Sequence, residues 1–333
     1  MKIFVFEYAT AVNDKNFIIE GRAMRNLMIY GLKKEGINTS TINNNSHNLY
    51  EKILKNVYNS DNTILMAPNY ELLKISNFLN RHDIFNKVLI SPIDSLNKTL
   101  NKFSLYKELK GMISMPKTTK FPNLTDFPVI IKPIYGTGCE SIYAFKDNEC
   151  YERFVKSGKQ KFNENFIVQE FIDGIHTSVC LFAGKEVYPV SLNGQYINFD
   201  KVKVSYDGGV VPFQANEYIK SNIKSNIKSK IFEYSKLACM HLDLKGYIGI
   251  DFVIDTKNEK IYLIEINPRI TTSAIALSKT TNLNIAKLHI ACFKDGEILS
   301  KELSKVKFLN VAEIFKDKDK IMCRIKNKKQ TPI

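Results

Sequence analysis

Two apolar segments that lie only four residues apart impose the strongest constraint on this chain. The segments "GYIGIDFVID" (246–255) and "KIYLIEINP" (260–268) are rich in β-branched and aromatic residues, and "TKNE" between them has the length of a hairpin turn. They predict an antiparallel pair of core strands. Because opposite residues of such a pair lie about 5 Å apart, Asp251 can lie beside Glu265 and Asn267.

The acids of this hairpin need a partner if they are buried. Two carboxylates taken into a protein core repel each other and destabilise it. A hard divalent cation with oxygen ligands removes that cost, and an amide oxygen is a further suitable ligand. We therefore interpret Asp251, Glu265 and Asn267 as metal ligands. The alternative is a charged strand end in solvent, which the apolar flanks of both segments do not favour.

A glycine-containing loop upstream has features of a phosphate site. In "IIKPIYGTGCES" (130–141), Lys132 stands inside an apolar strand and precedes Gly136 and Gly138. Glycines allow backbone amides to approach an anion, and lysine adds a point charge. The loop does not match GxxxxGK[ST]. A glycine-rich hairpin with a lysine that reaches solvent is therefore the alternative interpretation.

A second upstream segment suits a purine ring. The strand in "FIVQEFIDG" (166–174) ends in polar Gln169 and Glu170, which are followed by apolar Phe171 and Ile172. An adenine ring binds in an apolar slot that also offers hydrogen bonds to one edge of the ring, often from the backbone. An edge strand of alternating polarity is the alternative.

The order of the elements divides the chain into three expected domains. Residues 1–98 alternate strands at 2–8, 38–42, 62–68 and 87–91 with helices at 16–35, 46–58 and 70–80, which predicts a parallel sheet of about four strands. Residues 99–174 are expected to form a small α+β lid, with helices at 99–110 and 147–157. Residues 175–333 are expected to form a mostly antiparallel sheet with helices at 217–242 and 272–294, and to end in a basic tail or edge strand.

Composition excludes several classes of protein. The 333 residues are 44% hydrophobic, enough for a large core, yet no apolar run approaches the ~18–20 residues of a membrane span. The N-terminus does not resemble a secretory signal, so we expect a cytoplasmic protein without membrane contact. The six cysteines include no CxxC pair, which argues against structural zinc and a disulfide scaffold.

The net charge of +14 has two interpretations, a nucleic-acid-binding surface or a solvated basic surface. It accompanies a bias toward Lys, Asn and Ile along the whole chain, so we interpret it as a solvated surface that also suits a small polyanion such as ATP. We do not expect nucleic-acid binding as the main function.

The motifs "IIKPIYGTG", "VQEFIDG", "DFVID" and "IEINPR", in this order, resemble those of the ATP-grasp superfamily of carboxylate–amine ligases. The resemblance covers most of the chain. It implies an α/β and α+β ATP-grasp fold: an N-terminal parallel-sheet domain, a lid, and a C-terminal antiparallel-sheet domain with the metal site. It also implies ATP and two Mg²⁺ or Mn²⁺ ions. In such ligases a carboxylate attacks the γ-phosphoryl of ATP, and an amine then displaces phosphate from the acyl phosphate.

The resemblance assigns roles to individual residues. The phosphates of ATP would lie against Lys102, Lys132, Gly136 and Gly138, adenine against Gln169, Glu170, Phe171 and Ile172, and the ribose against His176. Asp251, Glu265 and Asn267 would hold the two metal ions, and Arg269 with Lys132 would be catalytic. Two positions depart from the family pattern. Many relatives have an acid at His176, and many have an arginine where Gly249 and Ile250 stand, so Arg269 would act without a second arginine.

Three further segments are similar to the tyramine–L-glutamate ligase family of methanofuran biosynthesis in methanogenic archaea. They are "MKIFVFEYATA", "FIIEGRAMRNLM" (17–28) and "SYDGGVVP" (205–212). That family joins the γ-carboxyl of glutamate to the amine of tyramine. The similarity implies substrate contacts at Glu7, Tyr8, Glu20, Arg22, Gly208 and Gly209.

In this interpretation Arg22 would pair with a substrate carboxylate, Glu20 would hold an ammonium group, and the two glycines would form a loop over the acyl phosphate. The alternatives are a solvated first helical turn and a plain hairpin turn. Two other functions stay open: an ATP-grasp amino-acid ligase with another amine acceptor, as in the pyrrolysine pathway, and an ATP-binding protein without ligase activity. ATP-grasp ligases are often dimers, so a homodimer is one assembly that the resemblance allows.

Overall fold

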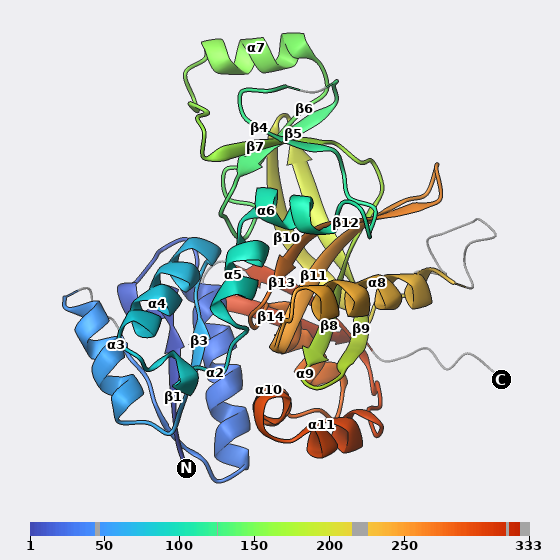
Figure 1. Ribbon diagram of the computed structural model, residues 1–333. Coiled ribbons are helices and arrows are strands. Elements are labelled where there is room, and N and C mark those ends of the chain that lie inside the picture. Colours follow the sequence, from blue (N-terminus) through green and yellow to red (C-terminus); the bar gives the residue numbers. More distant parts are fainter. Residues whose placement is uncertain (44–46, 125, 215–225, 318–319, 327–333) are drawn as a thin grey trace, which may run out of the picture.

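The computed structural model describes residues 1–43, 47–124, 126–214, 226–317 and 320–326 (Figure 1). The N-terminal part contains β1 (Lys2–Glu7), α1 (Tyr8–Val12), α2 (Ile18–Lys34), β2 (Asn38–Ser40), α3 (Leu49–Tyr58), β3 (Asn62–Met66), α4 (Asn69–Arg81) and the short 3-10 helix η1 (Phe85–Lys87). Next come α5 (Ile93–Leu100) and α6 (Lys102–Leu109). The rest of the segment predicted as the lid (99–174), called the lid below, contains β4 (Thr118–Lys120), β5 (Val129–Pro133), β6 (Tyr143–Phe145), α7 (Asn148–Lys156) and β7 (Phe166–Glu170).

The remaining elements build the large sheet and the helices packed against it. They are β8 (Ile175–Ala183), β9 (Val187–Asp200), β10 (Lys203–Val211), α8 (Ile227–His241), β11 (Gly246–Asp255), β12 (Lys260–Asn267), α9 (Ser273–Thr280), α10 (Ile285–Lys294), α11 (Gly296–Leu303), β13 (Val311–Asp317) and β14 (Lys320–Lys326). The predicted residues 217–225 of the helix before β11, and the last residues 327–333 of the predicted basic tail, lie outside the described residues. The predicted edge strand is β14.

The N-terminal sheet is parallel, as predicted, but has three strands in the order β2–β1–β3 rather than about four. The predicted strand 87–91 forms one isolated bridge, between Val88 and Thr63. Leu89 N still donates to the carbonyl of Thr63, but Ile90 N turns back to the carbonyl of Val88. Pro92 then follows and offers no N–H, so the pairing ends.

The large sheet runs β12–β11–β8–β9–β10–β6–β5–β7–β4, with β13 and β14 joined to it through β10. Among the described strands, β10 meets the lid strand β6 at the single pair Lys203–Tyr143. In Figure 1 the lid lies at one end of this sheet and the N-terminal part beside it, with α5 and α6 where the parts meet. The predicted helix 99–110 is in fact two helices, because Asn101 leaves helical geometry and its side chain caps α6.

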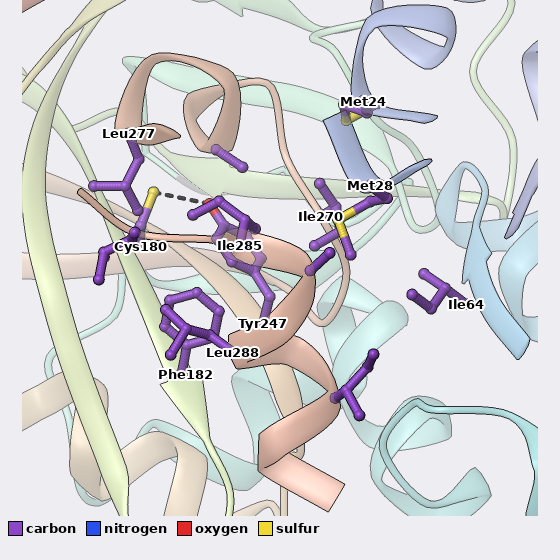
Figure 2. Close-up of a cluster of buried hydrophobic side chains, with 14 of the residues drawn as sticks. Met24, Met28, Ile64, Cys180, Phe182, Tyr247, Ile270, Leu277, Ile285 and Leu288 are labelled. Carbon is purple, nitrogen blue, oxygen red and sulfur yellow. Dashed lines mark hydrogen bonds between the residues drawn. The ribbon is translucent and has the colours of Figure 1, made fainter. Parts of the chain in front are cut away.

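A shared hydrophobic core fixes the N-terminal part against the large sheet. Met24 and Met28 of α2 and Ile64 of β3 belong to the same buried cluster as Tyr247 of β11 and Ile285 of α10 (Figure 2). The hydroxyl of Tyr247 donates to the Sγ of Cys180 at 2.8 Å, the dashed line in Figure 2. Within the described residues, no helix combines the length and the hydropathy that crossing a bilayer requires.

The neutral ring of His289 connects the large sheet, at Tyr247, with the N-terminal part, at Leu89. Its Nδ1 accepts from Tyr247 N at 3.0 Å, so the proton on Nε2 faces the carbonyl of Leu89, also at 3.0 Å. Burial lowers the pKa of His289 to about 4. A second proton, on Nδ1, would oppose the N–H of Tyr247 and place a charge in the core.

The free energy of unfolding is therefore expected to depend on pH through His289. Because the unfolded chain binds this proton at a higher pH than the folded chain, the ring contributes stability above about pH 6.5, and about 3 kcal/mol is lost as the pH falls toward 4. Urea unfolding between pH 4 and 7 measures this slope. His289→Gln should flatten it, whereas the same change at the exposed His47 should not. Equal slopes in the wild type and His289→Gln would contradict the assignment.

Candidate active site

One cavity of about 770 Å³ collects residues from the N-terminal part, the lid and the large sheet. Its walls form three zones. The first is a lid-side zone with Ile130, Gln169, Glu170, Phe171, Ile172, His176 and Phe199. The second is a central zone with Lys102, Lys132, Gly136, Asp251, Glu265, Asn267 and Arg269. The third is an N-terminal zone with Glu7, Phe17, Glu20, Met24, Met66, Pro68 and Lys316.

The β11–β12 hairpin brings the two acids of the central zone together, as predicted. Asp251 is directly opposite Glu265, and Gly249 is opposite Asn267. The Nδ2 of Asn267 donates to Asp251 at 3.2 Å and to Glu265 at 3.1 Å. Gln195 of β9 donates to the other oxygen of Asp251 at 2.9 Å. Both carboxylates are thereby held side by side on the floor of the cavity.

Two buried lysines face these carboxylates. The Nζ of Lys102 lies 3.3 Å from Glu265 and donates to the carbonyl of Gly136 at 3.1 Å. Lys132 is only 3% exposed. Burial, and then the neighbouring Lys102, lower the pKa of Lys132 to about 8. Burial and the carboxylate of Glu265 raise the pKa of Asp251. For Glu265, burial also acts to raise the pKa, but the charges of Lys102 and Lys132 together with the hydrogen bonds from Asn267 and Lys102 lower it overall.

The donor set of this hairpin fits a hard divalent cation. In the part of the chain that the structure describes, no three His, Cys, Asp or Glu side chains form a metal-binding group. The oxygens available at this hairpin are those of the Asp251 and Glu265 carboxylates and of the Asn267 amide. At present the amide of Asn267 turns its Nδ2 toward both acids. A half-turn of that amide presents Oδ1 instead, and water or phosphate oxygens then complete the coordination that Mg²⁺ prefers.

Arg269 stays on the cavity side of the strand despite Pro268. Its Nη2 donates to the hydroxyl of Thr137 and lies 3.5 Å from Asn267 Oδ1, and its Nη1 donates to the carbonyl of Ile270 at 3.2 Å. Its Nε is buried and has no hydrogen-bond partner in the described chain. The guanidinium is thus held beside the glycine-containing loop, and its Nε–H is available to donate to a ligand.

The glycine-containing loop 134–142 passes over the central zone. Gly138 has φ +61°, which favours glycine, and a Cβ there would lie 2.8 Å from the ring of Phe17. A Cβ on Gly136 would lie 3.8 Å from the Nζ of Lys102. The loop therefore contacts both the cationic centre and the start of α2.

The lid-side zone contains all five predicted adenine and ribose residues. Gln169 is buried and donates to the hydroxyl of Thr118 at 2.9 Å, whereas Glu170 is exposed. Phe171 N already donates to the carbonyl of Pro128, at 3.1 Å. Burial lowers the pKa of His176, so its ring is a neutral hydrogen-bonding group there. Phe199 of β9, which the sequence did not single out, contacts the rings of Phe171 and His176.

The N-terminal zone contains two of the four substrate residues predicted in this part of the chain. Glu7 caps α1 through Ala9 N and Thr10 N, and burial raises the pKa of its carboxyl. Glu20 also lines the cavity. The helical periodicity of α2 that turns Glu20 toward the cavity leaves Arg22 exposed, and Arg22 is not in the cavity wall. Tyr8 instead packs against the core around β1 and α4.

The predicted loop at Gly208 and Gly209 is wrong, because both lie within β10 between β9 and β13. A Cβ on Gly208 would lie 2.2 Å from the carbonyl oxygen of Ile314, and one on Gly209 2.3 Å from that of Gly194. These glycines let three strands approach closely. Neither lines the cavity.

Gly21 is expected to be intolerant of a side chain because it packs on Glu7. A Cβ there would lie 2.2 Å from Glu7 Oε2, which the cap of α1 holds in place. We expect Gly21→Ala to lower the free energy of unfolding by about 1–3 kcal/mol, the usual cost of overpacking. Gly111→Ala is the control: a Cβ there meets no atom within 4 Å. Equal urea-unfolding curves for the two variants would contradict this packing.

Besides Phe199, the residues of the cavity wall that the sequence did not indicate include Gln195, Tyr206 and Lys316. Gln195 lies in β9 and reaches Asp251 only through strand pairing that its own sequence does not reveal. Tyr206 is partly buried in the wall, and burial raises its pKa. Lys316 comes from β13, far along the chain, in a stretch that reads as a basic tail. Spacing alone indicates none of these contacts.

Similarity to known proteins extends over most of the chain. Residues 99–273 match the family model of the ATP-grasp domain. The chain is 30% identical, over 90% of its length, to the tyramine–L-glutamate ligase of Methanocaldococcus jannaschii, of which 91% is covered. It is 29% identical, over 90% of its length, to the same enzyme of Methanocaldococcus fervens, of which 96% is covered. A crystal structure of an ATP-grasp superfamily protein from Archaeoglobus fulgidus superposes with a TM-score of 0.73 at 25% identity, covering 98% of this chain and 99% of the other.

Proposed function

The chain belongs to the ATP-grasp family and is an ATP-dependent ligase, and on that premise we propose that it joins the γ-carboxyl of L-glutamate to the amine of tyramine, with release of ADP and phosphate. The observation that carries this proposal is the order of the three zones in one cavity. The apolar lid-side zone suits adenine, the central zone gathers the charges that phosphoryl transfer needs, and the N-terminal zone is left for the two substrates to be joined.

The residues of the central zone would have different roles in phosphoryl transfer. Asp251, Glu265 and Asn267 would hold two Mg²⁺ or Mn²⁺ ions, which neutralise phosphate charge when bound. Lys102 and Lys132 add cationic charge beside the phosphates. Arg269, already fixed by Thr137, would bind the transferring phosphoryl group and so favour attack by the glutamate γ-carboxylate. The amine then attacks the acyl phosphate, the amide C–N bond forms, and phosphate leaves.

The N-terminal zone supports an aromatic amine as the acceptor. Phe17, Met24, Met66 and Pro68 give it an apolar wall, and thioether and aromatic side chains pack well against a phenol ring. Glu7 contributes a buried carboxylate at the same end. An arylalkyl amine places its ring on the wall and its amino group toward the central zone.

The cellular role follows from the same proposal. The product, an amide of glutamate and tyramine, would enter methanofuran biosynthesis, in the cytoplasm. We further propose a homodimer, and three domains at 1–98, 99–174 and 175–333. Size-exclusion chromatography with light scattering tests the assembly.

A substrate panel tests the reaction. Purified protein with ATP and Mg²⁺ or Mn²⁺ is given glutamate with tyramine, phenethylamine, lysine or no amine, and ADP release and product mass are recorded. We expect amide formation to be fastest with tyramine. Turnover with another amine but not with tyramine would identify a ligase with a different acceptor. ATP binding without any amide product would identify a nucleotide-binding protein that is not a ligase.

A further inference from the structure

The C-terminal hairpin β13–β14 contributes a cation to the cavity although it lies outside the matched ATP-grasp region. In Figure 1 this hairpin lies beside α2. Lys316, near the end of β13, lines the N-terminal zone. Its Nζ is 3.4 Å from Glu20 Oε1 of α2 and 3.4 Å from the carbonyl oxygen of Asn16. Two segments separated by about the whole chain thus bring opposite charges together at the cavity wall.

The ion pair between Glu20 and Lys316 leaves hydrogen-bonding capacity unused on both side chains. The side chains of Glu20 and Lys316 are 24% and 42% exposed, and both belong to the cavity wall. The second oxygen of Glu20, Oε2, is buried and has no hydrogen-bond partner among the residues described. A buried carboxylate oxygen without a donor is costly, so a ligand that brings a donor here is stabilised. The ammonium of Lys316 has further donor capacity as well.

We propose that Glu20 and Lys316 bind the α-ammonium and the α-carboxylate of the amino-acid substrate, respectively. The inference rests on the proposed function and deepens it, because it assigns the residues that recognise glutamate as an α-amino acid. A zwitterionic head group offers one positive and one negative group on adjacent bonds, which complements one acid and one ammonium a few ångströms apart.

Other ligands of the reaction match this pair less well. Tyramine carries an ammonium but no carboxylate, so beside this pair it would bring no second anion for Lys316. The adenine and ribose of ATP have no charge to offer it, and the phosphates have Lys102 and Lys132 in the central zone. Only the amino acid supplies both charges.

The pair is also connected to the reacting centre. Asn16, which accepts from Lys316, has its side-chain amide 3.5 Å from Glu140 of the glycine-containing loop. The same loop meets Phe17 at Gly138 and Arg269 at Thr137. The loop therefore connects the Glu20–Lys316 pair with Arg269, and the proposal requires the γ-carboxylate of glutamate to extend along it.

Substrate analogues that lack one charge test the proposal. Glutarate keeps the γ-carboxyl but lacks the ammonium, and 4-aminobutanoate keeps it but lacks the α-carboxylate. With tyramine and ATP, we expect Glu20→Gln to lower kcat/KM for glutamate about 10- to 100-fold while leaving glutarate nearly unaffected. Lys316→Gln should lower the kcat/KM for glutamate by about the same factor and leave the kcat/KM for 4-aminobutanoate nearly unchanged. The KM for ATP should stay unchanged in both.

Lys326→Gln is the matched control on the same hairpin. Lys326 pairs with Glu313 at 2.6 Å, and neither residue lines the cavity, so this variant should keep wild-type ratios among the three acids. Equal losses for all three acids in Glu20→Gln and Lys316→Gln, or no loss, would overturn the assignment while leaving the ligase reaction intact. Failure of the wild-type protein to use glutamate, with turnover of another acid, would overturn the proposed function and this assignment with it.

Discussion

Replacing Glu265 with glutamine is expected to lower ligase turnover at least about 10³-fold while the chain still folds. The change keeps the shape of the side chain but removes one of the two carboxylates of the β11–β12 hairpin in the central zone. Lys102 loses the anion that now lies 3.3 Å from its Nζ, and the site for the divalent cation loses a ligand. Asn267→Ala, which removes the amide that both acids share, is expected to have a similar effect.

Steady-state ADP release at saturating ATP measures this loss, and thermal unfolding reports on the fold. Glu259→Gln is the matched control, because Glu259 is exposed in the turn of the same hairpin. It should behave as the wild type. Magnesium-dependent turnover that survives both Glu265→Gln and Asn267→Ala would show that the metal ligands are misassigned.

Arg269→Ala is expected to lower kcat by about 10³-fold, the scale of an arginine that stabilises a transferring phosphoryl group. The KM for ATP should change little, because the lysines and the lid-side zone remain. Added guanidinium should restore part of the activity, since the buried space between Thr137 and Asn267 is kept. Arg269→Lys should recover less than the wild type, because one ammonium cannot reproduce a planar fork of donors.

Arg153→Ala, on the exposed face of α7, is the control for this experiment. It should retain wild-type kinetics and show no response to guanidinium. A large rise in the KM for ATP without a fall in kcat would assign Arg269 to nucleotide binding instead.

The centre of the site could be predicted from the sequence because it is local. Asp251 and Glu265 lie on two strands joined by a short turn, so hairpin pairing brings them close together, and a β-bulge between Asp251 and Phe252 then sets Asp251 directly opposite Glu265. The predicted adenine residues, 169–172, follow one another along β7 and its exit. In both places, neighbours in space are neighbours in sequence.

The parts that depend on distant packing were not predictable in this way. Whether Glu20 or Arg22 faces the cavity depends on which side of α2 packs against the large sheet. Gly208 looks like a turn residue, but it is a point of close approach between β10 and β13. Lys316 reads as part of a charged tail until β13 pairs with β10 and carries it to α2.

The transfer of oxygen from substrate to phosphate tests the central claim most directly. Glutamate labelled with ¹⁸O in its γ-carboxyl is incubated with ATP, tyramine and the enzyme, and the released phosphate is analysed by mass spectrometry. If the γ-carboxylate attacks ATP, each released phosphate should carry one ¹⁸O, and the amide carbonyl should keep the other. Phosphate without ¹⁸O, together with amide product, would contradict activation of this carboxylate by ATP.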